Sequence, residues 1–111
     1  MKKIKTISEL GKIKKNGKSI GLITGVFDIL HYEHVQFLCF AKKKVDVLIV
    51  GIECDNNVKL FKGNKRPIFN FKQRALVVSS LECVDFVFKI PEIKKGKTSC
   101  SEFYKNIIKF T

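Results

Sequence analysis

The sequence lacks the features that mark membrane-spanning, secreted and zinc-binding proteins. No apolar run approaches the length that spans a bilayer, and the basic start of the chain has no apolar signal region behind it. The four cysteines include no Cys-x-x-Cys pair, which argues against a zinc or dithiol site and favours reduced thiols. The sequence therefore predicts a cytoplasmic protein without a membrane partner.

Acidic residues are also scarce: 10 Asp and Glu stand against 22 Lys and Arg, which gives a formal net charge of +12. This excess predicts attraction to anions such as nucleotides, phosphosugars, nucleic acid or acidic membrane surfaces. The length of 111 residues and the apolar fraction of 45% suit one unit with a hydrophobic core. We expect a basic lead with a short helix over residues 1–17, followed by one domain over residues 18–111.

The apolar residues follow strand-like and helix-like spacings in turn. Residues 53–70 are polar and basic, contain Gly63 and Pro67, and are predicted as a long functional loop. The β-α-β-α-β order predicts an α/β fold, with a parallel sheet and helices on both faces. The patterns predict strands over residues 19–24, 45–52 and 84–90, and helices over residues 6–15, 32–44, 71–81 and 101–110.

The most informative segment follows the first predicted strand. Residues 25–28 lead from that strand into the next helix, and His31 and His34 follow at the helix start. Backbone N–H groups and the positive end of the helix dipole converge at such a turn and favour an anion. Two imidazoles three residues apart lie on the same face of the first turn. The pattern predicts an anion site. The alternative is a pair of surface histidines and an Asp28 that only caps the helix.

This segment resembles the Gly-x-Phe-Asp-x-x-His-x-Gly-His signature of the cytidylyltransferase-like nucleotidyltransferases. Over residues 17–91 the chain resembles most of all the adenylyltransferase domain of ADP-heptose synthases. It is also similar to glycerol-3-phosphate cytidylyltransferases and archaeal FAD synthetases. The further pieces that match in order and spacing are Gly17-Lys18, Leu48-Ile49-Val50-Gly51, Asp55, Lys62-Gly63, Arg66-Pro67-Ile68, Arg74-Ala75 and Val84-Asp85.

The resemblance implies a Rossmann-like nucleotidyltransferase fold, with the family's later strands missing after the third strand of this sequence. It implies transfer of a nucleoside monophosphate, with AMP from ATP as the leading case, to a phosphorylated small molecule such as a sugar phosphate. Pyrophosphate is released, and Mg²⁺ accompanies the nucleotide without a metal site in the protein. Catalysis of this kind depends on positioning and charge stabilisation.

The resemblance also implies roles for single residues. Catalysis falls to His31, His34 and Lys62, because the imidazoles bind the triphosphate and stabilise the α-phosphoryl transition state. Lys62 and Arg66 are expected to bind substrate phosphate. Arg74 is expected to anchor the loop or the phosphates, and pairing with a surface carboxylate is the alternative. The implied nucleotide-binding residues are Gly25, Val26, Phe27, Asp28, His31, His34 and Arg74.

Two departures from the family pattern affect this interpretation. Glu33 stands where the family has glycine, and a carboxylate about 4 to 6 Å from phosphates would cost about 1 to 4 kcal/mol in binding. The alternative is a Glu33 side chain turned toward solvent, or toward a substrate hydroxyl or amine, which would reduce this cost. With the later strands missing, the first strand, which includes Leu22, is expected at an open edge of the sheet. An open edge predicts a homo-oligomer or another partner there. Asp55 is expected to cap a turn rather than touch a ligand.

Two other functional classes stand beside an active nucleotidyltransferase. One is a degenerate relative that binds nucleotide or a protein partner. The other is a basic nucleic-acid-binding module, which the charge alone suggests; the sequence has no recognised nucleic-acid motif and no basic-aromatic surface pattern. We therefore expect a nucleoside triphosphate and a phosphorylated small molecule as partners, and no nucleic acid.

Overall fold

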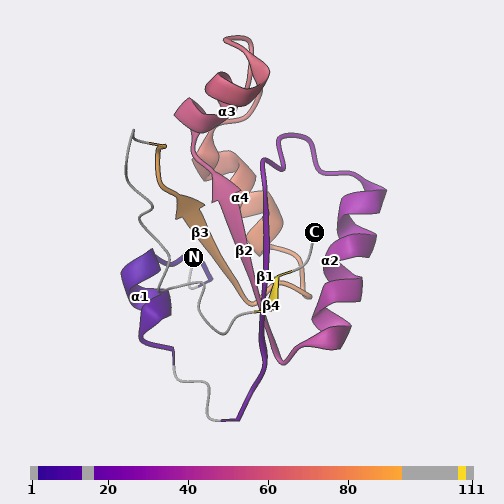
Figure 1. Ribbon diagram of the computed structural model, residues 1–111. Helices are drawn as coiled ribbons and strands as arrows, with labels where there is room; N and C mark the ends of the chain where they lie inside the picture. Colours follow the sequence, from indigo (N-terminus) through magenta and orange to yellow (C-terminus); the bar gives the residue numbers. More distant parts are fainter. Residues whose placement is uncertain (1–2, 14–16, 94–107, 110–111) are drawn as a thin grey trace.

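A parallel sheet organises the chain. The computed structural model describes residues 3–13, 17–93 and 108–109, and within these ranges the sheet has four strands in the order β3-β2-β1-β4 (Figure 1). Each neighbouring pair is parallel. The strands are β1 (Ile20–Gly25), β2 (Val47–Glu53), β3 (Phe86–Ile90) and β4 (Ile108–Lys109), and the helices are α1 (Ile7–Gly11), α2 (Tyr32–Lys44), α3 (Asp55–Lys62) and α4 (Phe71–Ser79).

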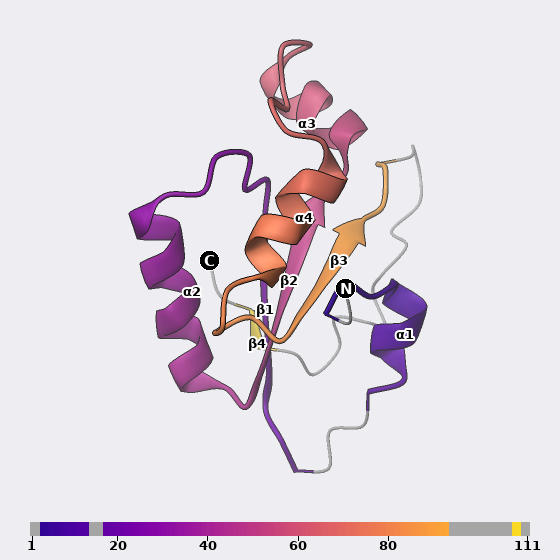
Figure 2. The same cartoon turned by 180° about the vertical axis from the view of Figure 1, so that it is seen from behind.

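Helices cover both faces of the sheet, as the sequence predicted. α2 and α4 pack on one face, where Leu38 and Val78 join Val50 of β2 in the larger core cluster (Figure 2). α1 packs on the opposite face, where Leu10 joins Phe88 of β3 in a second cluster. β2 is covered on both sides, which explains its nearly continuous apolar sequence. The predicted α/β fold with a parallel sheet is confirmed.

The loop predicted over residues 53–70 contains α3, so this prediction is wrong for that part. The N-cap residue of α3, Cys54, makes no side-chain capping bond, and the sequence therefore carries no start signal for this helix. Asn57 of α3 is buried and held by distant groups. Its Nδ2 donates to Pro91 O at 3.0 Å, and its Oδ1 accepts from Ile93 N at 2.9 Å. Figure 1 shows α3 standing beyond the carboxyl end of β2.

β4 overturns two predictions about the later part of the chain. Gly21 and Leu22 of β1 pair with Ile108 and Lys109, so β1 does not form an open edge at these positions. Ile108 and Lys109 are extended, and the helix predicted over residues 101–110 therefore does not include them. The rest of that predicted helix lies outside the described residues. The sheet continues past the third strand.

The basic lead lies along the other edge of the sheet. Lys5 N donates to Val87 O at 2.8 Å, and Val87 N donates to Lys3 O at 2.9 Å. Ile4 forms a parallel bridge with Val87. These bonds satisfy backbone groups of β3 that an open edge would leave unpaired.

Among the residues that the structure describes, no helix is long and apolar enough to cross a membrane. Cys39, Cys54 and Cys83 are free thiols, and Cys100 lies outside the described residues. Burial, together with a hydrogen bond to Cys39, raises the pKa of the Cys83 thiol to about 11. Cys83 is therefore protonated at neutral pH and weakly nucleophilic.

Candidate functional site

The turn after β1 depends on Gly25 and Phe27. Phe27 has a φ of 51°, in the left-handed region that residues other than glycine rarely adopt. Its ring folds back over Gly25, where a Cβ atom would lie only 2.9 Å from Phe27 Cε2. Glycine is therefore needed at position 25 because the ring approaches so closely. The Phe27 ring also meets the His34 ring edge-on, with 5.7 Å between centroids.

His31 and His34 form the start of α2. His31 is the N-cap, and its Nδ1 accepts from Glu33 N at 3.2 Å. His34 Nδ1 accepts from His31 N at 3.2 Å, which completes a capping box. Because Nδ1 of each ring accepts a hydrogen bond, Nε2 is the ring nitrogen that carries the N–H donor. The two ring centroids are 3.9 Å apart.

The protonation of His34 follows from its surroundings. Burial lowers the pKa of His34 below its ordinary value, the nearby His31 lowers it further, and Glu33 opposes the shift. His34 is therefore neutral at pH 7, and its Nδ1 remains an acceptor for His31 N.

A cavity of about 620 Å³ brings together seven of the residues singled out in the sequence, which are Val26, Phe27, Asp28, His31, His34, Lys62 and Arg66. His31 and His34 from the start of α2 line it together with Lys62 from the end of α3 and Arg66 from the segment after α3. Glu33 does not line this cavity, and its side chain is exposed. The carboxylate that replaces the family's glycine is therefore outside the space that the four basic side chains surround.

Asp28 does not cap α2, because His31 is the N-cap. Its Oδ2 accepts from Ile68 N at 2.8 Å and from Arg66 Nη1 at 3.3 Å, and its Oδ1 accepts from Phe69 N at 2.9 Å. Burial acts to raise the pKa of Asp28, but the two backbone N–H groups and Arg66 outweigh it and hold the pKa below the ordinary value. Asp28 is therefore an ionised link between the turn and the segment that leads into α4.

Arg74 is a buried structural centre. Its side chain has 0% exposure, and its Nη2 donates to Asp55 Oδ1 at 2.6 Å. Nη1 donates to Val26 O and to Glu53 O, both at 2.8 Å, and Nε donates to Phe69 O at 2.9 Å. Arg74 thus joins the carboxyl ends of β1 and β2 and the first residue of α3 to the start of α4. The anchoring role and the carboxylate partner are both observed, whereas direct binding of nucleotide by Arg74 stays a prediction.

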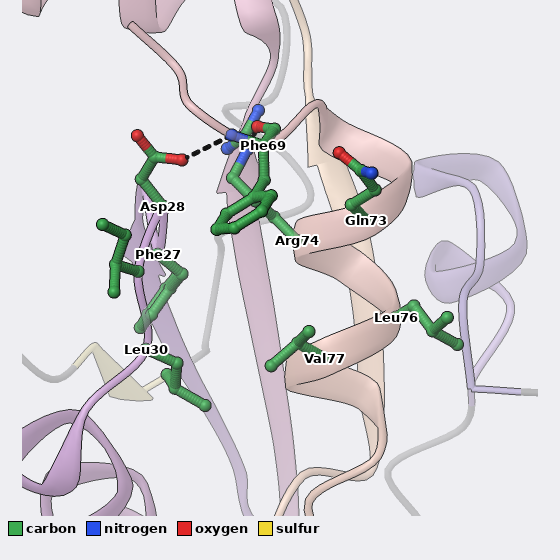
Figure 3. A pocket seen from close by; sticks show the side chains of 9 residues that line it. Phe27, Asp28, Leu30, Phe69, Gln73, Arg74, Leu76 and Val77 are labelled. Atoms are coloured by element: carbon green, nitrogen blue, oxygen red, sulfur yellow. Dashed lines mark hydrogen bonds between the residues drawn. The ribbon is translucent and has the colours of Figure 1, made fainter.

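A second cavity, of about 470 Å³, lies on the α4 side of Asp28, and no pattern in the sequence predicted it. Its wall is mostly apolar and includes Leu30, Phe69, Leu76 and Val77 (Figure 3). Figure 3 also shows the Asp28 carboxylate turned toward the segment of Phe69. Leu76 and Val77 are about half exposed, so the outer side of α4 is apolar without being core.

Comparison with known families decides the membership of the chain. The sequence model of the family described as Cytidylyltransferase-like matches residues 22–108. The chain belongs to this family. The resemblance read from the segment between Gly25 and His34 is thereby confirmed for the family.

Several proteins are similar to this cytidylyltransferase-like chain. The bifunctional protein HldE of Campylobacter fetus subsp. fetus (strain 82-40) is 42% identical over 86 residues, which are 78% of this chain and 19% of that protein. The bifunctional protein HldE of Aliarcobacter butzleri (strain RM4018) is 46% identical over 88 residues, 76% of this chain and 18% of that protein. The chain thus spans less than one fifth of the length of these curated relatives.

Two solved structures share the fold. The lipopolysaccharide core biosynthesis protein from Thermoplasma volcanium GSS1 has a TM-score of 0.68 and 34% identity, over 83% of this chain and 73% of that one. A pantoate-beta-alanine ligase from Francisella tularensis has a TM-score of 0.55 and 23% identity, over 78% of this chain and 34% of that one, and shows the fold alone. The Rossmann-like nucleotidyltransferase fold expected from the sequence is confirmed.

Proposed function

We propose that this chain transfers a nucleoside monophosphate, with AMP from ATP as the leading case, to a phosphorylated small molecule such as a sugar phosphate. One observation carries the proposal: His31 and His34, whose Nδ1 atoms already accept hydrogen bonds, line a cavity that Lys62 and Arg66 also line, which leaves their Nε2–H groups as donors. Donors and cations converging on one cavity suit a polyphosphate. Asp28, the carboxylate in the same wall, is already bound by three donors.

The similarities support this choice of reaction. The relatives include the bifunctional protein HldE and a lipopolysaccharide core biosynthesis protein, and the sequence resembles the adenylyltransferase domain of ADP-heptose synthases. A sugar phosphate is the acceptor that fits these likenesses best. ATP is the nucleotide that the same resemblance favours over CTP.

In the proposed reaction an oxygen of the acceptor phosphate attacks the α-phosphorus of the nucleotide. The bond from the α-phosphorus to the oxygen bridging to the β-phosphate breaks, and pyrophosphate leaves. The Nε2–H groups of His31 and His34 donate to the phosphate oxygens on which negative charge builds up. Lys62 and Arg66 bind phosphates and hold the reactants in line. Arg74 acts indirectly, because it holds the Val26 carbonyl and so positions the turn.

Mg²⁺ enters this reaction as part of the nucleotide substrate, coordinated by phosphate oxygens and water. Among the residues that the structure describes, no group of three or more His, Cys, Asp or Glu could hold a metal ion. The basic residues of the cavity contact the substrate phosphates, and the ion neutralises further charge on them. We place the reaction in the cytoplasm.

Thermal unfolding with ATP, CTP, GTP or UTP, each with Mg²⁺, tests nucleotide binding before the acceptor is known. A nucleotide at about 100 times its Kd stabilises the folded chain by about 2.7 kcal/mol. We expect ATP to give the largest shift, and we expect Lys62→Met to weaken binding by about tenfold through loss of a charge-assisted contact. Lys43→Met is the matched control, because Lys43 is exposed at the far end of α2, and it is expected to bind as the wild type does.

The outcomes separate the functional classes. Release of pyrophosphate from ATP with one of a panel of phosphosugars supports the transferase. A thermal shift with ATP but no pyrophosphate across the panel contradicts the transfer step and leaves a nucleotide-binding relative. No shift with any of the four nucleotides contradicts the proposal as a whole and favours a relative that acts through a protein partner.

A further inference from the structure

Asp28 is bound to the segment that carries Arg66. Of the three bonds that its carboxylate accepts, two come from backbone N–H groups, Ile68 N at 2.8 Å and Phe69 N at 2.9 Å. The third, from Arg66 Nη1, is the longest at 3.3 Å. The Asp28 side chain is only 10% exposed, whereas that of Arg66 is 44% exposed. Asp28 therefore holds the backbone of residues 68–69 by two short hydrogen bonds and the Arg66 guanidinium by one long hydrogen bond.

The chemistry of this contact requires a carboxylate. An ionised carboxylate only accepts hydrogen bonds, and both of its oxygens are used by N–H groups of one segment. An asparagine would turn an NH₂ donor toward one of these N–H groups and would also remove the charge that attracts Arg66. Asp28 lines both the 620 Å³ and the 470 Å³ cavities, so it stands in the wall between them.

We propose that Asp28 is the positioning residue of the phosphate cavity: it fixes residues 66–69 so that the Arg66 guanidinium stands at the cavity before an anion arrives. The proposal rests on the proposed function, since the anion is a phosphate of the nucleotide or of the acceptor. When a phosphate binds Arg66, it replaces the 3.3 Å contact and leaves the two backbone bonds in place. The segment therefore stays fixed in the empty and in the occupied site.

A double-mutant cycle tests whether Asp28 acts through Arg66. The variants are Asp28→Asn, Arg66→Met and the double variant, and the probes are inorganic tripolyphosphate and ATP with Mg²⁺, both measured by calorimetry. Arg66→Met is expected to weaken binding by about tenfold through the lost charge-assisted bond, and Asp28→Asn by a smaller factor. In the Arg66→Met background, Asp28→Asn is expected to have no further effect on Kd.

Asp46→Asn is the matched control. Asp46 Oδ2 also accepts from a backbone N–H, Ser19 N at 2.9 Å, but it lies at the opposite end of the sheet, before β2. It is expected to leave both Kd values unchanged. If Asp28→Asn does not fold, Asp28→Glu replaces it in the cycle, because glutamate keeps the charge but displaces the oxygens by one methylene group. The same loss of coupling is expected.

Three outcomes overturn the positioning role. The first is that Asp28→Asn weakens binding by the same factor with and without Arg66. The second is unchanged affinity in Asp28→Asn despite reduced stability. The third is unchanged hydrogen exchange at the Ile68 and Phe69 amides, which we expect to exchange faster in the variant. The exchange measurement needs no ligand, so it decides on the positioning even if the wild-type chain binds neither probe and the proposed function fails.

Discussion

Replacement of the buried Arg74 by methionine tests whether this side chain is structural. Methionine keeps an unbranched apolar stem and removes every donor of the guanidinium. The change leaves the carbonyls of Val26 and Glu53 without the guanidinium donor that they share and separates Asp55 from its cation. A buried acceptor without a partner costs about 1 to 3 kcal/mol, and loss of one member of a buried ion pair costs about 3 to 5 kcal/mol.

Exposure of the partners limits the expected loss. Asp55 has a side chain 40% exposed, so water can solvate its carboxylate in the variant. Phe69, whose carbonyl also accepts from Arg74, is 43% exposed. We therefore expect Arg74→Met to lower the free energy of unfolding by about 3 to 5 kcal/mol, a large part of the roughly 5 to 15 kcal/mol of a typical domain.

Urea unfolding of Arg74→Met beside Arg66→Met provides the assay. The two variants undergo the same chemical change, but Arg66 is 44% exposed and makes one ion pair at 3.3 Å. Its loss is expected to cost about 0 to 1 kcal/mol. Equal stability of the two variants would refute the role assigned to Arg74. Reduced nucleotide affinity in a fully stable Arg74→Met chain would instead favour direct contact with the nucleotide.

Three further substitutions test the site. Because the pKa of His34 is lowered in the folded chain, the unfolded chain binds a proton at His34 more readily, and the free energy of unfolding falls as the pH drops below about 6.5. His34→Gln keeps a side chain that can complete the capping box, and its free energy of unfolding is expected to fall less between about pH 7.5 and pH 5. Equal declines in the variant and the wild type would contradict this. Gly25→Ala forces the Phe27 ring to move and is expected to lower the free energy of unfolding in urea by about 1 to 3 kcal/mol. Gly11→Ala is the control, because a Cβ atom at Gly11 meets nothing within 4 Å, and it is expected to be neutral or slightly stabilising. Glu33→Gly is expected to change the calorimetric Kd for ATP by less than about threefold, because the side chain is exposed outside the cavity. A tenfold gain in ATP affinity would instead show that Glu33 repels the phosphates, as the cost of about 1 to 4 kcal/mol from charge alone implies.

The parts of the fold that sequence reasoning found are those with local causes. α2 has the predicted bounds, because a turn that begins at Gly25 precedes it and three lysines end it where cations favour the helix dipole. β2 is recognisable from its apolar run, although it begins at Val47 instead of residue 45. α4 begins at the predicted residue, after Asn70 and Gln73 form a capping box. Each of these signals is read within a few neighbouring residues.

The parts that sequence reasoning missed depend on distant groups. α3 is fixed by Asn57, whose partners Pro91 and Ile93 lie beyond α4 in the chain. The carbonyl partners of Arg74 could not be identified from the sequence, because every residue has a backbone carbonyl. Asp28 was expected to bind the nucleotide or to cap α2, but its bonds to Arg66, Ile68 and Phe69 could not be predicted from either segment. His31, His34, Lys62 and Arg66, which line one cavity in the structure, were singled out because they belong to motifs with a fixed order, and their roles stay predictions.

β1 and β3 each take their second neighbour from a segment far away in the described sequence, and we expect this to set an order of assembly. β1 and β2 are close in sequence and can pair early, whereas β1 gains its other neighbour, β4, only from residues 108–109. β3 gains its outer neighbour from residues near the start, at Ile4. Closing such long loops is slow and leaves paired strands with unprotected edges in the meantime. We therefore expect the β1–β2 pair to be the part of the sheet most exposed to aggregation until β4 pairs with β1.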